Sequence, residues 1–384
     1  MKANESLSSG QYIDQAKRLL EDRLGTTNQK PACAFSCGVV GIMADHTHYF
    51  EGFALVLRMR QGVAIALRPN TLDRHRFVLE GAPDLNFSEI RPSKNLSISS
   101  LFQAILGAVE APSGVCYDVS LVGSIPTGLG AAFHGALTVS LVRALNEIKS
   151  TTISDTELRI QALSALESWY GQRFSPAYVI GAIANQSEPF ILIDTKTFSH
   201  LPIDISPESK LGWGIIEWST DWSLAFSSAP SRYKAAALAL NDLNKSGFKD
   251  VTSFRELEHR DLEQALESVP KRSRGALKHL VTENRNVQKL IVALKKSDWQ
   301  FLGALMMISQ ASKANDWSTT DPIHELITAA AETAALDGIF GVVQSGEGKC
   351  MLVCGQPYSL PAFLDRIREV ASAHTTEQVE TFII

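Results

Sequence analysis

The chain has 384 residues and a mass of 41.9 kDa, with 45% hydrophobic and 20% charged residues. This composition supplies a sizeable core, so a chain disordered along its whole length is excluded, and the length suggests two or three domains or two interlocked lobes. The net charge of −5 and the pI near 6.0 argue against nucleic-acid binding through a globally basic surface.

The sequence lacks the usual signs of secretion and of membrane insertion. No apolar stretch reaches the roughly 18 residues of a membrane-spanning helix, and residues 1–17 lack the apolar core of a secretion signal. Five cysteines are few and odd in number, which is typical of reducing compartments. We therefore expect a cytoplasmic protein with neither a membrane nor a nucleic-acid partner, and the sequence indicates no particular protein partner.

Helices and strands are both predicted in the first half of the chain. Residues 13–24 place apolar side chains at helical spacing up to Gly25, and residues 53–67 alternate like paired strands. Further helices are predicted at 132–148 and 159–170, and further strands at 116–122 and 189–195.

The second half is richer in helices. Residues 199–210 are polar and contain prolines, so we place there the boundary between two lobes, 1–200 and 201–384. Helices are predicted at 255–267, 274–296, 301–313 and 322–336, and short strands at 338–343 and 350–353. Strands and helices do not alternate strictly, which favours the α+β class.

A glycine-rich segment joins a predicted strand to a predicted helix at residues 126–130. Gly128 and Gly130 allow the backbone to turn and to approach a ligand, and the next helix directs its free N–H groups to the same place. Phosphate suits such a place. A tight strand-to-helix turn also needs glycines, so the pattern alone leaves both interpretations open.

Two other segments carry side chains suited to binding. Asp45, His46, Thr47 and His48 follow an apolar run, and such groups can hold a polyhydroxylated substrate, although a capped turn is the alternative.

The second of these segments is the predicted loop between two strands near the end of the chain. Gly346 and Gly348 permit a close backbone approach there, and Lys349 adds a cation. A plain hairpin loop is the alternative interpretation.

In their order and spacing, the three segments resemble the motifs of the GHMP kinase superfamily, and within it those of the galactokinases. Residues 38–49, 126–137 and 346–350 match the three family motifs, and the resemblance extends over roughly residues 10–356. It implies a two-lobed α+β fold with the site in the cleft between the lobes. It also implies transfer of the ATP γ-phosphoryl group to a sugar's anomeric hydroxyl. ATP and Mg²⁺ are then the cofactors of an active chain, and a sugar is its small-molecule partner.

The resemblance also assigns residues to roles. It places the substrate at Asp45, His46, His48 and Tyr49, and the nucleotide at Gly128, Gly130, His134, Gly346, Gly348 and Lys349. It assigns no residue of this chain to a bound metal.

Departures from the family motifs fall on chemical positions. Val39 stands at the catalytic arginine and Asn185 at the catalytic aspartate; a valine carries no charge, and an amide cannot take a hydroxyl proton. His134 replaces the serine that helps to hold Mg²⁺, a metal that prefers oxygen ligands, and Phe133 adds bulk beside it. His48 replaces a sugar-binding aspartate.

Three functions follow from this pattern. The favoured one is a pseudokinase or sensor that binds a sugar, ATP or both, because the changes coincide at chemical positions. The second is an active ATP-dependent kinase of a galactose-like monosaccharide. Loss of a general base lowers the rate by only ~10²–10⁴-fold, and a loose transition state depends less on such a base. The third is a metal-dependent activity, if His46, His48 and His134 converge.

Overall fold

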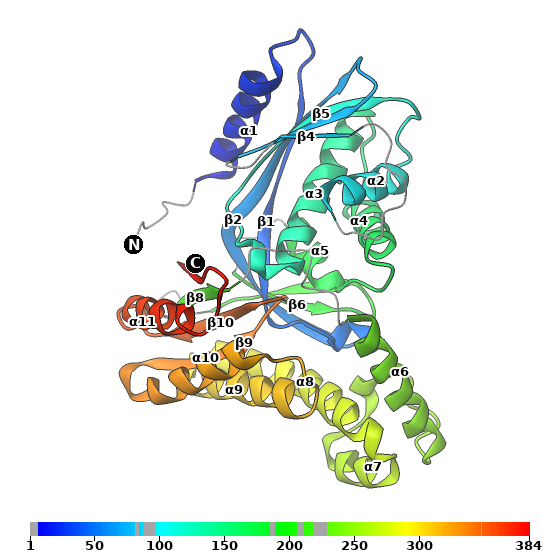
Figure 1. Cartoon of the computed structure of the whole chain (residues 1–384). Helices are drawn as coiled ribbons and strands as arrows, with labels where there is room; N and C mark the ends of the chain where they lie inside the picture. The colour runs from blue at the N-terminus through cyan, green and yellow to red at the C-terminus, as the bar shows by residue number, and fades with distance from the viewer. Residues whose placement is uncertain are drawn as a thin grey trace. The chain divides into compact units, whose positions relative to one another are not determined.

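The structure is a computed structural model of the whole chain (Figure 1), and the description covers residues 7–80, 84–87, 97–184, 189–205, 211–218, 229–346 and 348–384. The mixture of helices and strands confirms the predicted α+β class. The chain forms two compact units of interleaved segments. Unit 1 comprises Met1–Val39, Arg58–Pro126 and Ala132–Asn185; unit 2 comprises Val40–Leu57, Thr127–Ala131 and Gln186–Ile384. The predicted lobes are consecutive instead, and their boundary near residue 200 stays a prediction.

Unit 1 is built on a sheet with the strand order β4–β3–β5–β2. Strand β5 is antiparallel to the second part of β2 and parallel to β3. The strands are β2 (Phe53–Asn70), β3 (His75–Leu79), β4 (Leu85–Phe87) and β5 (Cys116–Gly123), and the helices are α1 (Ser9–Leu24), α2 (Ile98–Ala108), α3 (Ala131–Ile148), α4 (Asp155–Tyr170) and α5 (Pro176–Ile183).

Helix α1 shows how the sequence sets the limits of an element. Ser8 forms a capping box with Gln11 at its start, and Gly25 ends it with φ +81°, a conformation that glycine adopts without strain. Its apolar face, including Ala16 and Leu20, packs on the sheet. The end predicted at Gly25 is therefore confirmed.

Unit 2 contains two sets of paired strands. The first part of β2 pairs with β6, which pairs with β7, and a second, antiparallel sheet has the order β11–β8–β10–β9. The strands are β6 (Phe190–Asp194), β7 (Ser199–Ile203), β8 (Gly212–Glu217), β9 (Ile339–Gln344), β10 (Cys350–Gly355) and β11 (Glu380–Ile383). The helices are α6 (Ala229–Lys245), α7 (Leu262–Ser268), α8 (Lys271–Lys296), α9 (Trp299–Asn315), α10 (Pro322–Thr333) and α11 (Leu360–Ser372). Strands β1 (Ala32–Met43) and β2 have residues in both units.

Two predicted elements were wrong in form. Residues 53–67 are not paired strands but part of one strand, β2. Gly62 lies within β2, and the Phe35 ring that packs on it leaves no room for a side chain: a Cβ there would lie 2.3 Å from Phe35 Cζ. The predicted helix 255–267 begins instead as two 3₁₀ turns, and only α7 is α-helical.

Helix α9 meets β9 backbone to backbone. A Cβ added to Gly303 would lie 2.1 Å from the Phe340 carbonyl oxygen, and one added to Gly341 would lie 2.4 Å from the Gly303 carbonyl oxygen. These two glycines bring the helix directly against the strand, and the helix carries Lys313 while the strand ends at Gln344. This close approach positions the candidate site described below. Among the described residues, no helix has both the length and the apolar character needed to cross a membrane.

We expect Gly303→Ala to lower the free energy of unfolding by about 3 kcal/mol, because the new methyl group would overlap the Phe340 carbonyl oxygen. Gly10→Ala is the matched control, since its methyl group would meet only Ser8 Oγ at 4.0 Å. In helix α1 it should add about 0.5 kcal/mol. Urea unfolding of both variants measures the difference, and equal effects would contradict the close packing of α9 on β9.

Candidate functional site

The three segments singled out in the sequence lie in unit 2: residues 45–49, 128–130 and 346–349. The second and third segments meet backbone to backbone, because a Cβ on Gly346 would lie 2.1 Å from the Leu129 carbonyl oxygen. Gly346 has φ +74°, and its carbonyl accepts the Ala131 N–H at 3.4 Å. Both the conformation and the space at this position thus require glycine.

Glu217, at the end of β8, reaches the glycine-rich loop. Its Oε2 accepts the backbone N–H of Gly128 at 2.7 Å, and the side chain is buried. Burial raises the pKa of this carboxyl; the Gly128 hydrogen bond opposes the rise and the charge of Glu380 adds to it, and the resulting pKa is about 7. An N–H group expected to bind phosphate therefore donates to an acid of the chain itself.

Asp45, in the first segment, is paired with a buried lysine of α9. Lys313 Nζ lies 3.4 Å from Asp45 Oδ2 and donates to the Gln344 carbonyl oxygen at 2.6 Å. Both side chains are almost wholly buried, at 1% and 3% exposure for Lys313 and Asp45. An ion pair in such surroundings is held tightly once formed, because either charge alone would be costly.

A second buried carboxyl lies beside this pair. Burial and the charge of Asp45 raise the pKa of Glu283, while Lys313 and a hydrogen bond from Ser309 Oγ lower it. Glu283 therefore holds its proton more readily than an ordinary carboxyl group does.

Asp45 and Glu217 share one buried neighbour. Burial, followed by the charges of Glu217 and Asp45, raises the pKa of Cys350 well above its usual value. The thiol therefore lies near the first segment and near the partner of the glycine-rich loop, so unit 2 brings the three segments into one region.

The histidines of the first segment are buried. His46 adopts φ +69°, a left-handed conformation that is uncommon outside glycine. Its ring lies 5.4 Å from that of Trp317, and burial lowers its pKa well below the usual range, with His279 and Lys313 adding to the effect. The His48 ring lies 4.4 Å from that of Tyr49, which is buried too. His46 is therefore neutral.

Lys349, expected near phosphate, is paired within the chain. Its Nζ binds the carboxylate of Glu377, and its backbone carbonyl accepts the Trp218 N–H at 3.1 Å. The carbonyl of Gly348 accepts Gln344 Nε2 at 3.4 Å. The positive charge of this loop thus already faces a negative partner.

The remaining predicted residues belong to unit 1 or are not described. Val39 is buried against Gly181 of α5, where an added Cβ would lie 2.8 Å from Val39 Cγ1. His134 binds the Tyr170 hydroxyl through Nδ1, and burial lowers its pKa to about 3. Phe133, beside it, is buried as well. Asn185 lies outside the described residues.

Several buried polar atoms of unit 2 have no hydrogen-bond partner among the described residues. They are Thr47 Oγ1, Glu283 Oε1, Asn286 Nδ2, Trp317 Nε1 and Ser345 Oγ. They include both donors and acceptors, which is unusual for a protein interior and suits a polar ligand or water.

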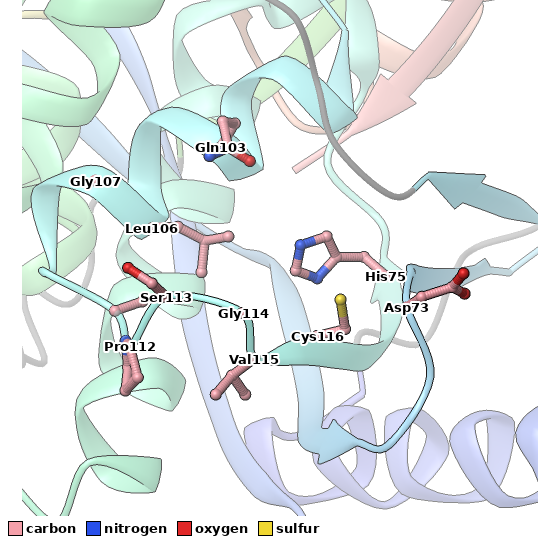
Figure 2. Close-up of a pocket in the computed structure, with 11 residues that line it drawn as sticks. Asp73, His75, Gln103, Leu106, Gly107, Pro112, Ser113, Gly114, Val115 and Cys116 are labelled. Carbon is pink, nitrogen blue, oxygen red and sulfur yellow. The ribbon is translucent and has the colours of Figure 1, made fainter.

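Across the described parts of the chain, no three His, Cys, Asp or Glu side chains gather in a way that could hold a metal ion, so the metal-dependent alternative gains no support. A pocket of about 630 Å³ lies in unit 1 (Figure 2), and none of its lining residues was singled out in the sequence.

Comparison with known proteins gives a consistent result. No protein-family model matches the chain. The galactokinase of Streptomyces coelicolor is 23% identical over 81% of this chain and 80% of its own length, and that of Glaesserella parasuis is 23% identical over 97% of both. Lactococcus lactis galactokinase, solved in complex with galactose, superimposes with a TM-score of 0.81 at 17% identity over 97% of both chains. Methanococcus jannaschii mevalonate kinase gives 0.60 at 12% identity, over 93% of this chain and 98% of the other.

The chain is galactokinase-like: it is similar in sequence to galactokinases over most of its length and shares the fold of GHMP-superfamily kinases. The resemblance predicted from the three motifs is therefore confirmed.

Sequence reasoning missed Glu217, Glu283 and Lys313 of this galactokinase-like chain. Glu217 is the last residue of strand β8, and Lys313 lies near the end of helix α9. A charged residue at such a position usually reaches solvent, so neither was expected in a buried site. One signal was present in the sequence: the apolar run Gly212–Glu217 ends in an acid rather than in a turn residue.

We expect Glu217→Gln to change the pH dependence of stability. The folded protein holds this proton up to about pH 7, whereas the unfolded chain releases it near pH 4.5. The wild-type free energy of unfolding should therefore fall by about 2 to 3 kcal/mol more than that of the variant between roughly pH 5 and pH 8. Glu369→Gln, at an exposed position of α11, should keep the wild-type slope. Parallel curves for wild type and Glu217→Gln would show that the carboxyl is not buried at the loop.

We expect Lys313→Met to lower the free energy of unfolding by about 3 to 5 kcal/mol, because it removes the ammonium group that pairs with the buried Asp45 carboxylate. The double variant with Asp45→Asn should recover most of this loss. Denaturant unfolding of both single variants and the double variant gives the coupling energy. The exposed Lys295→Met is the control, with an effect below about 0.5 kcal/mol. Strictly additive effects would argue against the ion pair.

Proposed function

We propose that this galactokinase-like chain binds a sugar-class ligand in unit 2 without transferring phosphate from ATP, as a pseudokinase or sensor. The observation that carries the proposal is the hydrogen bond from the Gly128 N–H to Glu217 Oε2 at 2.7 Å. The loop that suits a phosphate in kinases of this kind is occupied here by an acid of the same chain.

Charge repulsion is the first physical argument. Two unit negative charges about 4 Å apart repel by about 4 kcal/mol at an effective dielectric constant of 20. A nucleotide phosphate at Gly128 would meet the Glu217 carboxyl, and above about pH 7 that carboxyl is mainly ionised. Binding of ATP there would require protonating or displacing Glu217.

The other positions assigned by the resemblance support the same proposal. The resemblance implies ATP and Mg²⁺ as the cofactors of an active chain, and the residues present fit them poorly. Lys349 is paired with Glu377, and the ring of His134 is neutral and bound to Tyr170. Val39 packs in an apolar contact where a guanidinium would be needed.

The polar interior of unit 2 supports a sugar-class ligand. The Asp45–Lys313 pair and His46 are buried in this unit, and the His46 ring lies 5.4 Å from that of Trp317, whose buried Nε1 lacks a partner within the described residues. Asn286 Nδ2 and Glu283 Oε1 are further buried polar atoms of unit 2 that lack a partner there. A polyhydroxylated molecule offers both donors and acceptors and would satisfy such groups. The relative solved with galactose has the same fold, which makes galactose the first ligand to test.

We expect galactose to bind in isothermal titration calorimetry, and ADP release from Mg²⁺–ATP to stay at the no-sugar background. Glu217→Gln should strengthen ATP binding about tenfold or more, since it removes the charge but keeps an acceptor for Gly128. Glu380→Gln is the matched control, because Glu380 lies nearby without bonding to the loop, and should change ATP binding less. ADP release that depends on galactose would establish the active-kinase alternative instead.

A further inference from the structure

A second candidate site lies in unit 1, in a pocket of about 450 Å³ beside the first half of strand β1. Its volume is within the range of pockets that hold small organic molecules. The start of α1 and the end of α5 form parts of its wall, and most of the side chains that line it are small or apolar. Ile13, Phe35 and Ile183 supply the larger apolar surfaces.

Arg143, on helix α3, places its guanidinium group at the wall of this pocket. One of its amino groups donates to the Phe35 carbonyl oxygen and to Ser36 Oγ, each at 3.3 Å, and the other donates to the Ile183 carbonyl oxygen at 3.2 Å. All three partners line the pocket, so the hydrogen bonds themselves fix the position of the charged group. The Nε–H group of Arg143 donates to no atom of the described residues.

The positive charge of Arg143 has no ion-pair partner within the part of the chain that the structure describes. Its three hydrogen-bond partners are a hydroxyl group and two backbone carbonyl groups, all of them uncharged. Burial lowers the pKa of the guanidinium group, and Asp155 and Cys37 oppose this effect less strongly. Since arginine keeps its proton in proteins, this cation bears a cost of burial that an anionic ligand would offset.

The groups that line the pocket favour an anion. No acidic side chain of the described residues lines it, whereas Arg58 brings a second guanidinium group to its wall. Arg58 already donates to Cys37 Sγ, through Nε at 3.1 Å and through an amino group at 3.0 Å, so we assign the ligand's charge to Arg143. Helix α1 begins beside the pocket at Ser9 and helix α5 ends there, so the positive end of one helix dipole opposes the negative end of the other.

One acid reaches the rim of the pocket at Cys33. Glu147 Oε2 accepts the Cys33 N–H at 3.3 Å. Burial raises the pKa of the Cys33 thiol to about 11, and the charges that act on it are, in order of effect, those of Lys17, Glu147, Lys30 and Asp14. Two lysines and two acids thus meet at this rim, and the thiol between them is uncharged near pH 7. This end of the pocket therefore adds little net charge.

We propose that this pocket binds a small organic carboxylate with a short apolar body, whose carboxylate pairs with Arg143 and whose body lies against Ile13 and Phe35. The carboxylate accepts the Arg143 Nε–H and supplies the missing counter-charge, and the apolar body gains from leaving water. One guanidinium group without a counter-charge suits a ligand with a single negative charge. The site belongs to unit 1 and does not depend on the sugar-class ligand proposed for unit 2.

Benzoate and benzamide form a matched pair of probes, since they have nearly the same shape and differ in charge. We expect benzoate to bind the full chain about tenfold more tightly than benzamide in titrations followed by NMR. Arg143→Gln should weaken benzoate binding about tenfold and leave benzamide binding unchanged. Arg18→Gln, at an exposed position of α1, is the control and should change neither affinity.

A pair of variants at an exposed position tests the site without removing the hydrogen bonds of Arg143. Ser9 lines the pocket in the first turn of α1, where an acidic side chain also suits the helix dipole. Ser9→Glu should bind benzoate about fivefold more weakly than Ser9→Gln, because the two new side chains have the same size and differ in charge. Benzamide should bind both variants equally.

Equal affinities of the wild-type chain for the two probes would overturn the proposal. So would an unchanged benzoate affinity in Arg143→Gln, equal benzoate affinities in the two Ser9 variants, or no benzoate binding up to about 10 mM. None of these results depends on galactose or ATP.

Discussion

The ammonium group of Lys313 holds together the region that carries the candidate site. It pairs with Asp45 and donates to the Gln344 carbonyl, so it joins the first motif to the strand that leads into the third. Helix α9 can deliver a lysine to this depth only because Gly303 lets its backbone meet that of β9. A buried charge accepts few arrangements of its neighbours, and this one orders segments that are distant in the sequence.

The polar and charged groups of the candidate site are bound to other groups of the same chain. Gly128 binds Glu217, Lys349 binds Glu377, and Asp45 binds Lys313. A phosphoryl-transferring site instead directs its cations and N–H groups toward the substrate, because catalysis there depends on stabilising the charge of the transferred group. The fold is that of the galactokinase neighbour, while Gly128 and Lys349, which we propose would otherwise meet a nucleotide, are each bound to an acid of this chain.

The fold could largely be predicted from the sequence, and the site only in part. Helices with one apolar face, such as α8, are encoded locally, and three ordered motifs identified the family. By contrast, the partner of Lys313 lies 268 residues away, and no local pattern announces that pairing. Residues 53–67 were predicted to form paired strands, whereas they belong to one strand, and the contact that requires glycine at position 62, the nearby Phe35 ring, is a tertiary one. Whether His134 serves a ligand or the core likewise depends on Tyr170.

Strand β11, at the edge of the second sheet, affects the carboxyl group that binds the glycine-rich loop. It pairs with β8 in a register that sets Glu380 opposite Glu217, so two acids face each other across the edge of the second sheet. Peeling this outermost strand away would remove the repulsion and let water reach Glu217, and the acid would ionise more readily. Displacement of β11 would thus change the charge of the carboxyl group beside Gly128.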